Sequence, residues 1–161
     1  MLRAMPNWSY ILINALYHLG LALWIGGAVA LGALAAPVLF RTLPRPQAGA
    51  IFGPTLRRFA RLRVVALLLI VAGAGAKFLF YEGHAAILWL VLRWAAIAFL
   101  ALDLVYELGY QERAMERLRS QFTPEVGEDD PRRVAFGRLH KRAEALLRAS
   151  VIAALLALVL S

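Results

Sequence analysis

Three side chains that are positively charged, or can become so, interrupt long apolar stretches of this 161-residue chain. They are His18, Lys77 and Arg93. Ionisable groups at membrane depth are costly, so each of them is a candidate functional residue. A neutral imidazole is also a common ligand of haem iron and of transition metals. His18 is therefore a candidate ligand, and the alternative is a neutral histidine that is hydrogen-bonded to a neighbouring helix.

The elements that must position these residues are membrane helices. Hydrophobic residues make up 61% of the chain, and a run of ~20 apolar residues is enough to cross the hydrocarbon layer. We expect an all-α integral membrane protein, a four-helix antiparallel bundle in a single domain of residues 1–161. Its helices should cover about residues 8–40, 64–81, 85–120 and 131–160, and the third should leave the membrane near residue 110. Asp130 followed by Pro131 is a typical N-cap and first-turn pair for the fourth helix.

Small residues predict where helices approach closely. Steps of four from His18 lead to Ala22, Gly26 and Ala30, so we expect this face of the first helix to pack on a neighbour. His18 would then lie at the edge of that face and point into the bundle. The small residues 72–76 predict a similar contact for the second helix, and such faces would also allow a homodimer.

Basic residues are concentrated in two of the three connections. The first of these holds a basic amphipathic segment, residues 47–63, which we expect to lie along the headgroups with Phe52 and Phe59 dipping inward. By the positive-inside rule both basic connections are cytoplasmic, and both termini and His84 face outward. We therefore predict a multi-pass protein of the bacterial cytoplasmic membrane. Its formal net charge of +8 would face anionic lipid headgroups and not nucleic acid.

This orientation gathers the three buried cations into one layer. From the outer helix ends, His18, Lys77 and Arg93 lie at depths of roughly 15, 7 and 12 Å. Cations that share a layer repel one another, so they must reach outward to water or meet an anionic partner. Haem b would meet this need, with His18 on the iron, His84 as a second axial ligand, and Lys77 and Arg93 on the propionates. The alternative is that Lys77 reaches outward and Arg93 pairs with Glu82.

A second polar group is expected at the cytoplasmic ends of the helices. Its members are Asp103, Glu107, His140, Glu144 and Arg148. Glu144 and Arg148 are four residues apart and can pair on one helix face. A metal site formed by Glu107 and His140 is a weaker alternative to a solvated helix start. The sequence contains no cysteine, and we find no nucleotide-binding loop, nucleophile elbow or zinc-protease motif in it.

The motifs at both ends of the chain resemble one family. They are His18-x5-Trp24-x-Gly26-Gly27, Ala36-Pro37-x-x-Phe40, Ala48-Gly49, Phe52-Gly53 and Phe136-x-x-Leu139-His140. This pattern is similar to the DUF4149-type family of four-helix bacterial membrane proteins, which is related to the eukaryotic transmembrane protein linked to platinum-drug resistance. The chain departs from the late motif at Ala143 and Leu147, where we expect a small polar residue and an amide. The first helix also resembles, more loosely, CopD-like copper-resistance proteins and HemJ-type oxidases, which implies copper handling or a haem b ligand at His18.

The leading hypothesis from the sequence is a haem b-binding membrane protein that serves electron transfer, redox or gas sensing, or haem handling. Tyr17 and Trp24 would border the group that His18 binds. One alternative is a transport or metal-tolerance protein that passes a small solute or a metal ion such as copper, with His18 and His84 as its ligands. A cofactor-free membrane scaffold is the third. An enzyme, if there is one, would be a haem-dependent oxidoreductase.

Overall fold

The computed structural model describes residues 7–82, 86–121 and 130–161, and within these ranges the chain is helical and contains no strand. The predicted all-α class is therefore confirmed. The elements are α1 (Asn7–Val29), the π-helix η1 (Ala30–Ala35), α2 (Ala36–Thr42), α3 (Arg45–Phe80), α4 (Ile87–Tyr106), the π-helix η2 (Glu107–Gln111), α5 (Glu112–Arg119) and α6 (Pro131–Val159).

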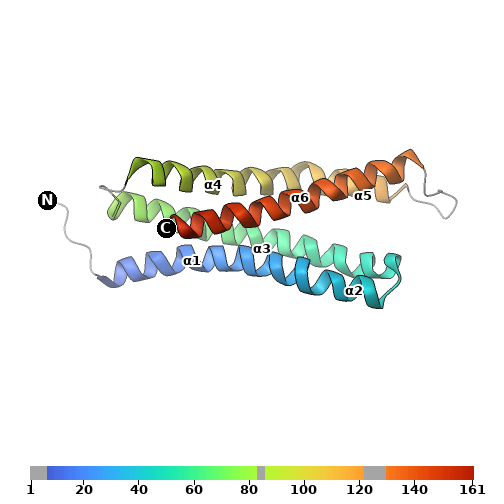
Figure 1. The fold of residues 1–161 in the computed structure, drawn as a ribbon, viewed down its shortest axis with the longest axis horizontal. Coiled ribbons are helices and arrows are strands. Elements are labelled where there is room, and N and C mark those ends of the chain that lie inside the picture. Colours follow the sequence, from blue (N-terminus) through green and yellow to red (C-terminus); the bar gives the residue numbers. More distant parts are fainter. Residues whose placement is uncertain (1–6, 83–85, 122–129) are drawn as a thin grey trace.

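These elements form four long rods that lie side by side (Figure 1). The first rod runs from α1 through η1 to α2, the second is α3, the third runs from α4 through η2 to α5, and the fourth is α6. Consecutive rods run in opposite directions, so the start of α1, the end of α3, the start of α4 and the end of α6 lie at one end. We call this the α3–α4 end, and the opposite one the α5 end.

Three helical segments in the described part of the chain are long and apolar enough to cross a membrane. They are Asn7–Thr42, Arg45–Phe80 and Ile87–Arg119. The fourth rod differs, because the apolar part of α6 begins only after Arg148, an exposed residue. From there to its end at Val159 the helix is about 16 Å long at ~1.5 Å per residue, which is less than the ~30 Å hydrocarbon layer.

The segment that was expected to lie along the headgroups forms the first half of α3, which is continuous from Arg45 to Phe80. The second helix therefore begins at Arg45 and not near residue 64. The aromatic residues of this segment contact other helices. Phe52 packs on Phe40 of α2 with ring centroids 6.0 Å apart, and Phe59 lies against Gly27 of α1. These contacts bury the Phe59 side chain and partly bury that of Phe52.

The π-helix η1 ends two residues before Pro37 in the first rod. Proline has no N–H group, and its ring conflicts with the carbonyl group one turn earlier, so it disturbs a regular α-helix. The wider turns of η1 accommodate this disturbance, and the N–H group of Ala36 donates to the carbonyl of Leu31, five residues earlier. The rod therefore continues to Thr42 without a break. As predicted, the Asp130 side chain caps α6, accepting a hydrogen bond of 2.7 Å from the Arg132 N–H group.

One buried apolar cluster joins all four rods and includes Leu21, Ile70, Leu100 and Ala154. The tightest approach is between α1 and α3. A Cβ atom at Gly73 would lie 2.7 Å from Cβ of Tyr17, closer than real atoms come. The predicted close contact around residues 72–76 is thus confirmed, and it brings Tyr17 against α3.

The face predicted for α1 is wrong. Ala22, Gly26 and Ala30 are all exposed, and a Cβ atom at Gly26 would meet nothing within 4 Å. The buried residues of α1 are Ser9, Tyr17, Gly20, Leu21, Trp24 and Ala28. His18 is half-buried beside this face. Small residues are as compatible with lipid as with a helix neighbour, so their spacing did not identify the packed side.

Candidate functional site

Arg93 of α4 is 2% exposed and pairs with Glu82, which follows α3. Two parallel hydrogen bonds join them. Nη1 donates to Oε1 over 2.6 Å, and Nη2 donates to Oε2. This two-point geometry is the strongest form of arginine–carboxylate contact. The pairing of Arg93 with Glu82, the alternative raised from the sequence, is therefore the one that the structure contains.

Lys77 of α3 is 3% exposed and lies close to the same pair. Its Nζ atom donates to Oδ1 of Asn14 over 3.3 Å and lies 5.2 Å from the centroid of the Tyr17 ring. The ring face attracts the ammonium group, and the amide oxygen accepts one of its protons. We call Asn14, Tyr17, Lys77, Glu82 and Arg93 the Lys77 cluster.

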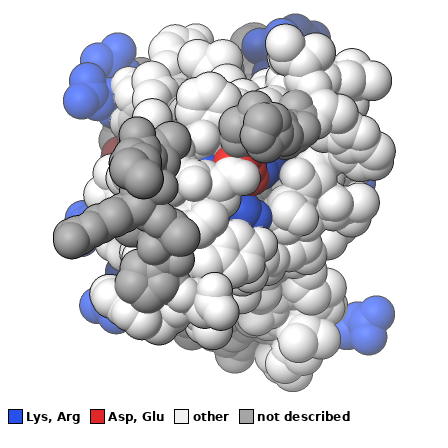
Figure 2. Space-filling view, turned by 90° about the vertical axis from the view of Figure 1, so that its left-hand side faces the viewer, with Lys and Arg blue, Asp and Glu red and all other residues white. Residues whose placement is uncertain are grey.

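The Lys77 cluster lies near the α3–α4 end, which Figure 2 shows face on. Acidic and basic atoms are visible near the centre of this end, with uncharged residues beside them. The side chain of Glu82 is 14% exposed, so the cluster reaches water at its rim only.

His18 follows Tyr17 on α1, and its ring meets the Tyr17 ring edge-on with centroids 5.5 Å apart. Nδ1 lies 2.7 Å from the backbone oxygen of Asn14, and Nε2 lies 3.3 Å from Oγ of Ser161. A carbonyl oxygen can only accept a hydrogen bond, so the proton of a neutral ring is on Nδ1. Nε2 then carries the lone pair and faces the end of α6.

A second charged cluster lies deeper along the rods, around Arg63 of α3. This residue is 1% exposed, and its Nη2 atom donates to Oε2 of Glu107 and lies 3.7 Å from Oδ2 of Asp103. Its guanidinium carbon is 4.7 Å from the Trp24 ring centroid and 5.7 Å from that of Phe59. We call Arg63, Asp103 and Glu107 the Arg63 cluster.

Two polar contacts tie α1 to α6 along the same stretch. Trp24 Nε1 donates to Oγ of Ser150 over 3.3 Å, and Tyr17 Oη donates to the backbone oxygen of Ala157 over 2.6 Å. Tyr17 thus belongs to the Lys77 cluster, and Trp24 contacts the Arg63 cluster. The two residues are seven apart, which is about 10 Å along a helix.

The polar group predicted at the opposite ends of the helices divides into two parts. His140 and Arg148 both contact Glu144 on the surface of α6, with N–O distances of 3.2 and 3.7 Å. Asp103 and Glu107 instead face Arg63. No group of three or more metal-ligating side chains occurs within the described ranges.

The structure brings together four residues that the sequence analysis named, Tyr17, Lys77, Glu82 and Arg93. It adds Asn14, which accepts a hydrogen bond from Lys77. His84 lies outside the described residues, so its assignment as a second ligand stays a prediction. His18, the candidate ligand, contacts the Tyr17 ring of the Lys77 cluster. Trp24 contacts the guanidinium group of Arg63 through its ring.

Arg63 is the residue that the sequence analysis missed, because it was counted among the surface arginines of segment 47–63. The distance in sequence between Arg63 and Lys77 could have identified it. The two residues are 14 positions apart, close to four turns of a helix, and therefore share one helix face. Ala66, Ile70 and Ala74 lie between them and are fully buried.

The length and composition of the helices are those of a membrane protein with several transmembrane segments. A family model described as "Domain of unknown function (DUF4149)" matches residues 19–121, and the chain belongs to this family. The match begins one residue after His18 and contains Lys77 and both members of each buried ion pair. No curated protein and no solved structure matches the chain.

Proposed function

We propose that the protein is a membrane transport protein that carries protons through a four-helix bundle of the bacterial cytoplasmic membrane. The observation that carries this proposal is a pair of buried charge clusters at two depths between the same helices. Intramembrane ionisable residues that face a helix interior commonly mark ion pathways and proton relays. α6 completes the bundle, and the arginine-rich α5 end faces the cytoplasm.

The Arg63 cluster has one basic side chain and two acidic ones. With all three charged it would carry a net charge of −1, which is unfavourable between buried helices. Oδ2 of Asp103 is buried and makes no hydrogen bond within the described part of the chain. One added proton on the carboxyl group of Asp103 or Glu107 would remove the excess charge. On Asp103 the proton could be carried by Oδ2 itself, and on Glu107 it would neutralise the neighbouring carboxylate.

The Lys77 cluster has the opposite imbalance, because Lys77 and Arg93 share Glu82 as their carboxylate. With all three charged the cluster would carry a net charge of +1. Release of one proton from Lys77 would neutralise it. The same proton, bound at one cluster and released at the other, therefore relieves both excess charges.

An apolar layer separates the two clusters. Leu21, Ile70 and Leu100 are fully buried in it. Arg93 and Asp103 are ten residues apart on α4, about 15 Å, which is too far for direct proton transfer. A helix movement or transient water must connect them, so we expect gated transport and not an open channel.

The experiment measures proton entry into liposomes that contain the purified protein and an internal pH-sensitive dye. A potassium gradient with valinomycin sets the interior negative. We expect the wild-type protein to acidify the lumen and Asp103→Asn to fall to the rate of protein-free liposomes. Glu112→Gln is the matched control, because this acid lies on α5 and pairs with Arg57 near the surface, 3.8 Å away.

Equal fluxes for Asp103→Asn and the wild-type protein would contradict the proposal. A wild-type rate no higher than that of protein-free liposomes would also contradict it. In that case a cofactor-free scaffold would become the better hypothesis, provided that the haem titration below is also negative.

Haem b binding at His18 is the second candidate function. The hydrogen bond from Nδ1 to Asn14 supports it, because this contact orients a ligating histidine and leaves the lone pair on Nε2. To bind iron, Nε2 would have to give up its contact with Oγ of Ser161. Lys77 and Arg93 suit it less well, since Asn14 and Glu82 already occupy them. They would have to exchange these partners for propionates.

A haem titration of the detergent-purified protein tests this candidate. A Soret band that forms in the wild-type protein and is lost in His18→Ala would support it, and His140→Ala at the exposed start of α6 is the control. The same two variants test copper, with the metal content measured after addition of a copper salt and gel filtration. Indistinguishable binding by His18→Ala and the wild-type protein would exclude His18 as the ligand.

A further inference from the structure

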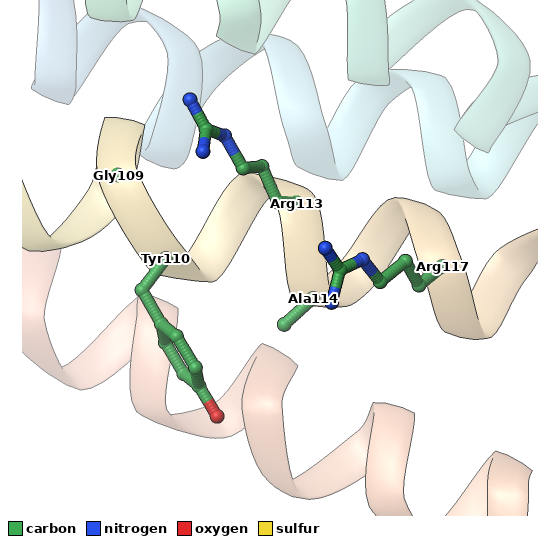
Figure 3. Close-up of a pocket in the computed structure, with 5 residues that line it drawn as sticks. All are labelled: Gly109, Tyr110, Arg113, Ala114 and Arg117. Carbon is green, nitrogen blue, oxygen red and sulfur yellow. The ribbon is translucent and has the colours of Figure 1, made fainter.

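A small basic depression lies on the outside of the third rod, where α4 passes through η2 into α5. Gly109, Tyr110, Arg113, Ala114 and Arg117 line it (Figure 3). Arg117 turns back over Ala114, Tyr110 extends toward α6, and Arg113 extends to the other side of the helix. No acidic residue is among the lining side chains.

The arginines of this depression form no ion pair with the acids of their own helix, and Arg113 also borders a neighbouring hollow lined by Glu112 and Glu116. Glu112 and Glu116 both turn to Arg57 of α3, with N–O distances of 3.8 and 3.7 Å. Arg113 and Arg117 are exposed and form no ion pair within the described ranges. The guanidinium group of Arg117, which lies over Ala114, is therefore available to an external anion, and Arg113 adds a second positive charge at the edge of the depression. A guanidinium group prefers the planar, two-point contact that a phosphate offers.

The depression lies at the edge of the apolar surface of the third rod. Leu102 and Val105 are 69% and 68% exposed, as expected for side chains that face acyl chains. Tyr110 follows them and is 58% exposed, and tyrosine is enriched at the membrane–water interface. Arg113 lies about 12 Å beyond Val105 along the helix, within the headgroup region.

We propose that this depression binds the phosphate of an anionic phospholipid, with Arg117 on the phosphate, Arg113 as a second positive charge at the edge of the depression, and Tyr110 at the glycerol level. The acyl chains would lie over Leu102 and Val105. Basic sites beside transmembrane helices on the cytoplasmic side are typical of such lipid contacts. The lipid would hold α5 at the membrane surface, a role that does not depend on transport.

The test is native mass spectrometry of the detergent-purified protein exposed to equal amounts of phosphatidylglycerol and phosphatidylcholine. Each basic residue near an anionic surface changes binding by about fivefold, so we expect Arg113→Gln with Arg117→Gln to lower phosphatidylglycerol retention by about 25-fold. The matched control is Arg58→Gln with Arg61→Gln, which removes the same charge from exposed positions of α3. We expect this control to retain the lipid.

Three outcomes would overturn the proposal. The first is equal retention of the two lipids by the wild-type protein, and the second is equal loss in both double variants, which would indicate net charge alone. The third is complete displacement of the lipid by millimolar inorganic phosphate, which would indicate a site for free phosphate. Circular dichroism of each variant checks that its helices are intact, and Tyr110→Ala provides a further variant that keeps both charges.

Discussion

Replacement of Arg63 by Gln should strongly destabilise the protein. The guanidinium group is 1% exposed, and it is the cation that faces Asp103 and Glu107. Removal of one partner from a buried ion pair costs about 3–5 kcal/mol, because the remaining charge has no compensation. The Glu107 side chain is 29% exposed and stays partly hydrated, so we expect a loss near 3 kcal/mol.

Arg61→Gln is the matched control for this prediction, because Arg61 lies two residues earlier on the same helix and is exposed. It should change the free energy of unfolding by no more than about 0.5 kcal/mol. Both variants can be measured by SDS titration in mixed micelles, with helix content followed by circular dichroism. A second test combines Arg63→Gln with Asp103→Asn, which removes one of the two uncompensated carboxylates and should recover about 1 kcal/mol or more.

The reasoning on Arg63 would be refuted if Arg63→Gln and Arg61→Gln lowered stability by the same amount. The Arg63 side chain would then be in contact with water, and not enclosed by α1 and α4. A loss without any recovery in the double variant would also contradict it, because the loss would then come from packing on Trp24 and not from the unpaired charges.

Two further variants test the contact between α1 and its neighbours by the same unfolding assay. Gly73→Ala would place a Cβ atom 2.7 Å from Tyr17 and should be about 1–3 kcal/mol less stable than Gly75→Ala, whose Cβ atom meets nothing within 4 Å. Equal stability of the two would mean that α1 and α3 are farther apart. Tyr17→Phe removes the hydrogen bond to Ala157 and should cost about 1 kcal/mol, whereas Tyr10→Phe, at a residue 43% exposed, should be neutral.

Local features of the chain were predictable because they depend on residues that are near one another in sequence. Apolar runs of sufficient length indicate membrane helices, and Asp130 before Pro131 indicates a helix start. The ion pair between Glu82 and Arg93 could also be predicted as an alternative, because the two residues are only 11 positions apart, on either side of one connection. These inferences need no knowledge of how distant helices pack.

The sequence by itself therefore determined the all-helical class, the apolar spans and the candidate status of Lys77 and Arg93. Only the tertiary structure decided that Arg63 faces Asp103 and that Gly20, not Gly26, lies on the packed side of α1. The physical reason is that lipid and a helix interior are both apolar, so hydrophobicity does not distinguish the two sides of a membrane helix. Which side is packed depends on backbone contacts such as that of Gly73 with Tyr17, which form between residues far apart in the chain.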